Sequence, residues 1–185
     1  KDVFGRSALM LAAKYNFAPI TDLSTVYFEF NMSDQAFGYH PDPEQNKKNK
    51  ALRCAIRKAY DWGQKIDRYY HGIGEPYEGI IPPGVDGYDP DLVHKSTVKD
   101  VSGAKKLLAE NGWNSKSLPT LEFSSTSSIQ KRQMYEQFRA WVGQIGYPKR
   151  KITHKTFANF SDYWKAIKEN KLSTHELVWN LDYPD

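Results

Sequence analysis

The stretch TVYFEFNM, residues 25–32, alternates apolar and other side chains along its whole length. One face of an extended chain would carry Val26, Phe28, Phe30 and Met32, and the other Tyr27, Glu29 and Asn31. A period of two residues is typical of a β-strand with one buried face. We therefore predict a strand over these residues.

Downstream of this strand the spacing of apolar residues changes. Residues 33–50 are polar and contain glycine and prolines, so we expect a loop there. From residue 49 to residue 61 the apolar positions, Leu52 and Ile56 among them, recur at helical spacing. This predicts a helix whose basic residues, such as Arg57, point into solvent.

The rest of the chain alternates between the two periods. Residues 72–90 are rich in glycine and proline, which favours an ordered loop or a linker. The order of elements is typical of an α/β domain that has a mixed or parallel sheet with flanking helices. The further elements we expect are a helix capped by Ser102 and ended by Gly112, a strand over 119–124, a helix over 129–145, a strand over 151–157, a helix capped by Ser161 or Asp162, and a strand over 176–181.

Composition excludes several classes of protein. Of the 185 residues, 39% are hydrophobic and 14% aromatic, which is not the composition of a disordered chain. The longest apolar run, near residues 8–13, is far shorter than the roughly 20 residues that a membrane-spanning helix needs. The net charge of +4 is a mild excess that fits a phosphate-bearing partner or simply a solvated surface.

The residues form no recognisable catalytic or metal-binding motif. The five histidines are isolated, and the single cysteine, Cys54, cannot complete a cysteine zinc site. Neither a glycine-rich phosphate-binding motif nor a serine-nucleophile motif occurs. Glu176 and Asp182 share one terminal segment, and the sequence pairs neither with the second carboxylate that glycoside hydrolysis requires. We expect no enzyme.

A nucleic-acid-binding domain is the alternative that the residues leave open. Between residues 53 and 70 basic side chains are interleaved with aromatic ones, which fits a surface that follows phosphates and stacks bases. The simpler interpretation is that the aromatic residues continue the apolar stripe of a helix while the basic residues face solvent. No known nucleic-acid-binding motif accompanies the stretch.

Five motifs, in order, resemble those of a known family. They are FEFNM at 28–32, KALRCAIRKAYDWGQKIDRYYHGIGEP at 50–76, GIIPPGVDGYDP at 79–90, AKKLLAENGW at 104–113 and VWNLDYPD at 178–185. Together they resemble the peptide-type (family 5) extracellular solute-binding proteins that serve ABC importers. Each motif alone is weak, but their common order over residues 24–185 makes the resemblance specific.

The resemblance implies one lobe of a two-lobed, type II periplasmic-binding-protein-like fold. Residues 25–185 would be the C-terminal ligand-binding lobe, incomplete at its C-terminal end. Residues 1–24 would lead from the other lobe or the hinge, and that N-terminal lobe would lie outside this sequence. The implied protein is secreted, either periplasmic or anchored by lipid at the cell surface, with its signal outside this sequence.

The resemblance also implies a function without a catalytic step. The protein would capture a peptide or another small solute in the cleft between its lobes and deliver it to an ABC transporter permease. We expect it to be monomeric, to need no cofactor or metal, and to bind no nucleic acid. Because the family also includes binders of sugars, nickel complexes and opines, the ligand stays open.

The resemblance assigns three candidate ligand-binding residues. In peptide binders of this family an aspartate three residues after a tryptophan pairs with the ligand's α-amino group, and Trp179 and Asp182 have this spacing. A carboxylate that is desolvated by cleft closure can form a charge-assisted hydrogen bond with an ammonium group. Trp179 would form a wall of the pocket, and Phe160 would line a side-chain pocket.

Each assignment has a structural alternative. Asp182 could cap a turn before Pro184, Trp179 could be a core residue, and Phe160 could pack in front of a helix cap. Some peptide binders carry an arginine three residues before the tryptophan to meet a ligand carboxylate, but this sequence has Glu176 there. That mode of carboxylate binding therefore cannot be transferred to this position.

Overall fold

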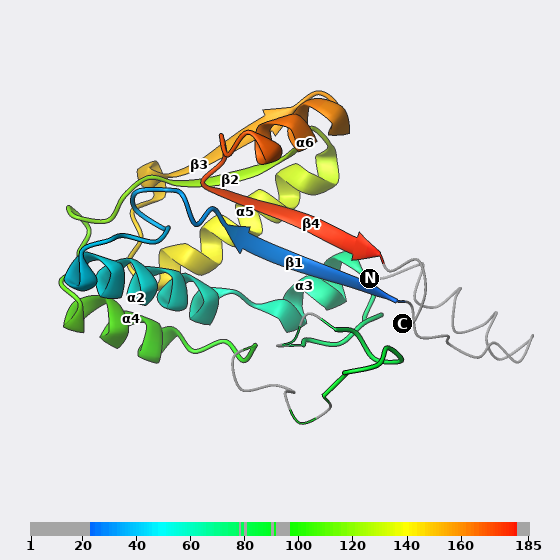
Figure 1. Ribbon diagram of the computed structural model, residues 1–185, viewed down its shortest axis with the longest axis horizontal. Helices are drawn as coiled ribbons and strands as arrows, with labels where there is room; N and C mark the ends of the chain where they lie inside the picture. Colours follow the sequence, from blue (N-terminus) through cyan, green and yellow to red (C-terminus); the bar gives the residue numbers. More distant parts are fainter. Residues whose placement is uncertain (1–22, 78, 80, 90, 92–96, 181–185) are drawn as a thin grey trace, which may run out of the picture.

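The computed structural model describes residues 23–77, 79, 81–89, 91 and 97–180. Within them it confirms the predicted α/β fold, a mixed four-stranded sheet with flanking helices (Figure 1). The expectation for Asp182 lies outside the described residues. The expectation for residues 1–24 also lies outside them, except at residues 23 and 24. None of the described helices is long and apolar enough to span a membrane.

The sheet has the strand order β1-β4-β2-β3. The strands are β1 (Ser24–Phe30), β2 (Leu121–Thr126), β3 (Ile152–Phe157) and β4 (Thr174–Asn180). β1 and β4 are antiparallel, while β2 is parallel to both of its neighbours. The three strands β2, β3 and β4 therefore end at the same edge of the sheet.

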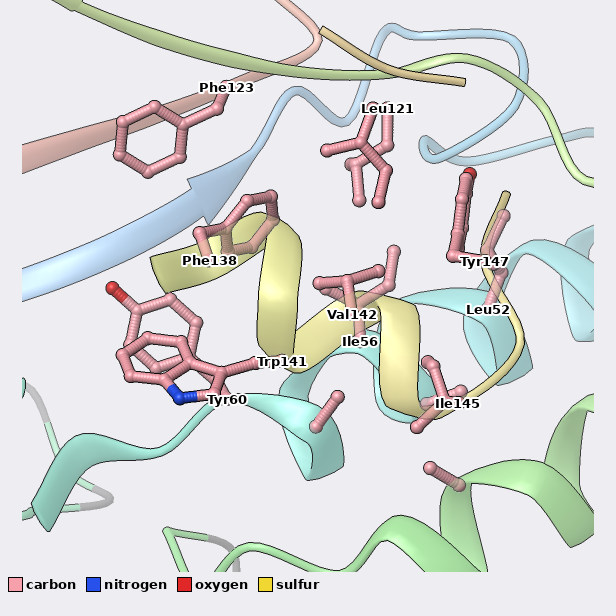
Figure 2. Packing of buried hydrophobic residues seen from close by; sticks show 14 of the residues in the cluster. Leu52, Ile56, Tyr60, Leu121, Phe123, Phe138, Trp141, Val142, Ile145 and Tyr147 are labelled. Carbon is pink, nitrogen blue, oxygen red and sulfur yellow. The ribbon is translucent and has the colours of Figure 1, made fainter. Parts of the chain in front are cut away.

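One face of the sheet packs against α2 (Pro43–Ala59) and α5 (Ile129–Gln144) in the main core. Phe28 of β1 packs against this core, with its ring centroid 5.6 Å from that of Tyr60, 6.2 Å from that of Phe123 and 5.3 Å from that of Phe138. Figure 2 shows Phe138 and its neighbours on α5 filling the space between strands and helices. The inward face predicted for residues 25–32 is thus confirmed for Phe28, which packs against this core together with Phe30. It is wrong for Met32, which lies beyond the end of β1 and is 51% exposed.

The other face carries a smaller apolar cluster beneath α6 (Phe160–Lys168). Tyr163 and Ala166 of this helix are buried with Leu172, and Leu177 of β4 packs against them. In Figure 1, α6 lies on the side of the sheet opposite to α5. The sheet is therefore covered by helices on both faces.

The predicted loop over residues 33–50 is wrong in its second half, because α2 already begins at Pro43. Proline is well tolerated in the first turn of a helix, since its missing N–H would have no partner there. The side chain of Asp42 caps the helix by accepting a hydrogen bond from the N–H of Gln45. The chain then leaves the helix at Tyr60 and enters the short α3 (Trp62–Tyr69).

Two predicted helix caps are also wrong by a few residues. The N-cap of α4 (Val101–Glu110) is Asp100, whose carboxylate also accepts a hydrogen bond from the hydroxyl of Ser102. The N-cap of α6 is Asn159 rather than Ser161 or Asp162. In both cases the helix begins upstream of the predicted cap, at Val101 and at Phe160, so the predicted cap residues lie in the first turn.

Candidate ligand-binding pocket

A pocket of about 310 Å³ lies where β2 ends, beside the middle of β4, and where α5 and α6 begin. In open α/β sheets ligands bind at the carboxyl ends of parallel strands, and the amino ends of helices add positive electrostatic potential there. The pocket therefore occupies the edge at which this fold type binds ligands. Its lining residues are Ser125, Thr126, Lys131, Phe160, Tyr163, Glu176, Leu177 and Val178.

Tyr163 connects the two strands beside this pocket. The single proton of its hydroxyl is shared between the carbonyl oxygens of Ser124 at 3.2 Å and Glu176 at 3.0 Å, and the hydroxyl accepts from the N–H of Glu176 at 3.1 Å. Burial raises the pKa of Tyr163 well above its usual value, so the hydroxyl stays protonated and remains a donor at neutral pH. This side chain fixes the spacing of β2 and β4 at the pocket wall.

Phe160, one of the three predicted site residues, lines the pocket. It is the first residue of α6 and is 60% exposed. Its ring stacks on that of Trp164, one helical turn further on, with centroids 6.3 Å apart and planes 12° apart. Phe160 therefore presents an apolar surface at the rim and is not buried in the core.

Trp179 lies elsewhere. It is 58% exposed near the end of β4, opposite Thr25 of β1, and among the described residues it does not line this pocket. Its neighbours Leu177 and Val178 do, so the pocket borders β4 only up to Val178. Trp179 is not a core residue, and the structure does not place it in one pocket with Phe160.

A buried ionic cluster that was not predicted from the sequence lies at the pocket. Glu176 lies on the core face of β4, opposite Phe28, and is 6% exposed. One of its carboxylate oxygens accepts from the ammonium of Lys65 and from the hydroxyl of Tyr60, and the other accepts from Lys131 at 3.1 Å. We call these four residues the Glu176 cluster.

The charges of the cluster depend on one another. Burial alone would raise the pKa of Glu176, but the ammonium groups of Lys65 and Lys131 outweigh this effect and hold the pKa below its usual value. Burial also lowers the pKa of Lys65, which the attraction of Glu176 opposes. Glu176 is therefore ionised at neutral pH and is the group that makes a buried lysine tolerable.

The prediction that the basic residues of this region face solvent is wrong for Lys65, which is 1% exposed. Its ammonium lies 3.0 Å from the Tyr60 hydroxyl and 4.7 Å from the centre of the Trp62 ring. Tyr60 and Tyr69 are themselves buried in the core. Lys65 and Tyr60 therefore serve an internal contact with Glu176 of β4 and are not exposed side chains of a basic surface.

A local signal for the cluster exists in the sequence. Glu176 stands in the strand ELVWNL at a position that the alternation of β4 turns inward, and an inward carboxylate requires a cationic partner. The partner is 111 residues away in the sequence, so the pattern of residues alone does not identify it. Among the described residues, no three His, Cys, Asp or Glu side chains are grouped closely enough to hold a metal ion.

The comparisons with solved structures agree on the fold. The periplasmic binding protein DppA from Helicobacter pylori, in complex with the peptide STSA, is 20% identical with a TM-score of 0.71 over 97% of this chain and 32% of its own. HbpA2 from Haemophilus parasuis is 21% identical with a TM-score of 0.72, and the match covers 96% of this chain and 33% of HbpA2. A dipeptide-binding protein from Pseudoalteromonas sp. SM9913, in complex with Met-Leu, is 23% identical with a TM-score of 0.69. This match covers 97% of this chain and 33% of the dipeptide-binding protein.

The chain thus spans about a third of the length of each of these proteins. Comparison with curated protein sequences gives no match. The model of the family described as "Bacterial extracellular solute-binding proteins, family 5 Middle" matches residues 7–185, nearly the whole chain. This chain therefore belongs to the family 5 bacterial extracellular solute-binding proteins.

Proposed function

We propose that the chain is part of the substrate-binding component of an ABC importer. In this role it captures a peptide or a similar small solute in a cleft between two lobes and delivers it to the membrane permease, without a catalytic step. The observation that carries the proposal is the pocket at the carboxyl end of β2, beside β4, in a chain of family 5. The protein would act as a monomer outside the cytoplasmic membrane, either periplasmic or at the cell surface.

The exposed apolar residues around the pocket support this role. Phe160 is 60% exposed, Val178 52% and Trp179 58%, and the last two lie at the end of β4. Clustered apolar residues on a surface mark a site that another group covers. In the proposed protein a ligand and the second lobe cover them when the cleft closes, and binding stabilises the closed state through its higher affinity for the ligand.

Two of the solved neighbours favour a peptide as the ligand. The Helicobacter pylori protein was solved with the peptide STSA, and the Pseudoalteromonas protein with Met-Leu. We propose that Asp182 binds the α-amino group of such a peptide and that Trp179, three residues earlier, covers part of the ligand. Phe160 would contact an apolar side chain of the ligand.

The test is calorimetry of peptide binding by the full-length protein, with the bound ligand first identified by mass spectrometry of the purified protein. Asp182→Asn should weaken binding of a peptide with a free amino terminus by about 2–5 kcal/mol, because one partner of a desolvated charge pair is lost. Asp185→Asn, which removes the same charge from the same segment, is the matched control. Equal affinities of the two variants would refute the assignment of Asp182, and failure to bind any peptide would refute the peptide ligand.

A further inference from the structure

Lys131 is the cation of the Glu176 cluster that reaches the pocket. It lies in the first turn of α5, where its N–H donates to the side chain of the N-cap, Ser128, at 3.0 Å. Its side chain is 29% exposed and lines the pocket, in contrast to that of Lys65, which is 1% exposed. The backbone of Lys131 is therefore fixed by the helix cap, and its ammonium lies between Glu176 and the open space.

The ammonium of Lys131 has hydrogen-bonding capacity to spare. A lysine ammonium carries three N–H donors. Among the described residues, Lys131 donates to one acceptor, Glu176. The hydroxyl of Ser125, which also lines the pocket, is engaged with the His154 ring at 2.8 Å. Donors of Lys131 are thus left for an acceptor that enters the pocket.

The charges around the pocket also favour an anion. Glu176 is the acidic residue among the described lining residues. The carboxylate oxygen that does not contact Lys131 already accepts hydrogen bonds from Lys65 and Tyr60. One carboxylate thus faces two ammonium groups, and the amino ends of α5 and α6 add positive potential at the same edge. The remaining wall is largely apolar, with Phe160, Leu177 and Val178.

We infer that Lys131 is a specificity residue that binds a carboxylate group of the ligand, while the adjacent apolar wall contacts the hydrocarbon part next to it. A single lysine beside an apolar wall suits an organic carboxylate better than a phosphate, which is usually held by several donors or by arginine. This inference rests on the proposed function, since it assigns the ligand chemistry of the same pocket.

The experiment uses full-length protein with ¹³C-labelled lysine, which leaves all three N–H donors of each ammonium in place. The NMR signal of Lys131 is assigned by its loss in Lys131→Met. The probes are 3-phenylpropionate, its neutral amide 3-phenylpropionamide, and inorganic phosphate. We expect 3-phenylpropionate to shift the Lys131 signal with a half-saturating concentration roughly 10- to 100-fold below that of the amide, as for a hydrogen bond to a charged group.

A second arm uses calorimetry with the peptide Ala-Ala-Phe and its C-terminal amide. Wild-type protein should prefer the free acid by a similar factor, and Lys131→Met should lose this preference while Lys131→Arg retains most of it. Arg132→Met is the matched control, because it removes the same charge from the neighbouring position, which lines a different pocket. It should leave the preference unchanged.

The outcomes separate this inference from the proposed function. If 3-phenylpropionate shifts the Lys131 signal but neither peptide binds, the carboxylate site stands and the peptide ligand is refuted. If the peptides bind while acid and amide probes act alike on Lys131, the inference is overturned and the proposed function stands. Saturation of the Lys131 signal by phosphate at a lower concentration than by 3-phenylpropionate would also overturn the choice of a carboxylate.

Discussion

Replacing Glu176 by glutamine tests whether the cluster holds the sheet and its helices together. The substitution preserves the size of the side chain and one acceptor oxygen but removes the negative charge. Lys65 would then be left with its ammonium buried beside Tyr60 and Trp62. Lys131 would lose its carboxylate partner as well, although its side chain reaches solvent.

The expected loss of stability follows from the exposure of the two lysines. Removing one partner of a buried ion pair costs about 3–5 kcal/mol. Lys65 and Glu176 are 1% and 3% exposed in their side chains, so this pair carries most of that cost. The contact with Lys131, which is 29% exposed, adds at most about 1 kcal/mol. Since glutamine keeps one acceptor, we expect Glu176→Gln to lower the free energy of unfolding by about 3–4 kcal/mol.

The assay is urea denaturation of the full-length protein at pH 7, followed by tryptophan fluorescence. The matched control is Glu169→Gln, since Glu169 forms its ion pair with Lys171 at the surface, where the side chains are 39% and 64% exposed. It should leave the transition midpoint unchanged. In the double variant Lys65→Met/Glu176→Gln, the loss should be at least about 1 kcal/mol smaller than the sum of the two single losses.

Two results would refute this reasoning. If Glu176→Gln had no more effect than Glu169→Gln, Glu176 would not be a buried partner of Lys65. If the double variant were as unstable as the sum of its parts, the two residues would contribute independently, and the loss in Glu176→Gln would have to come from another contact.

Three further predictions concern other parts of the molecule. Hydrogen bonds from Lys58 and from the N–H of Gly103 lower the pKa of Asp100 from 3.8 to about 2. The ionised carboxylate therefore stabilises the fold fully above pH 4, and this contribution is lost as the pH falls to 2. The unfolding midpoint of Asp100→Asn should lose that part of its dependence on acid pH, and an unaltered pH profile would contradict the prediction. Phe138→Ala should cost about 3–5 kcal/mol of unfolding free energy, because the ring is 1% exposed in the main core, and a loss below about 1 kcal/mol in urea denaturation would speak against that packing. Phe160→Ala should weaken ligand binding in calorimetry while the unfolding midpoint stays within error, and the opposite pattern would make Phe160 a packing residue.

The elements that sequence predicts well are those whose apolar pattern is set by burial on one side. The strand around Phe28 and the helix predicted over residues 129–145 are both present, because the same core buries one face of each. The apolar pattern misses the start of α2, because a polar stretch that contains proline favours a loop. Asp42 and Pro43 instead supply an N-cap and a first-turn residue. Local chemistry at the helix end, absent from the apolar pattern, determines that boundary.

The candidate site is harder to predict because its parts come together only in the tertiary structure. Phe160 was found through a resemblance between whole sequences, and its place at the pocket rim follows from where α6 meets the sheet. Lys65 looks like a surface residue of a basic segment, yet it is buried because α3 turns it toward β4. A pairing between residues that lie 111 positions apart is a property of the fold and leaves no local pattern.

The Glu176 cluster links stability to recognition through one carboxylate. Its first oxygen holds the buried Lys65, and this contact is needed whether or not a ligand is present. Its second oxygen holds Lys131 beside the pocket. A ligand carboxylate that binds Lys131 would share that ammonium with Glu176, so the lysine need not leave its partner to bind the ligand. Because the lysine is already positioned, ordering its long side chain adds little to the entropic cost of binding. The same glutamate that makes a buried cation tolerable thereby prepares a second cation for an anionic ligand.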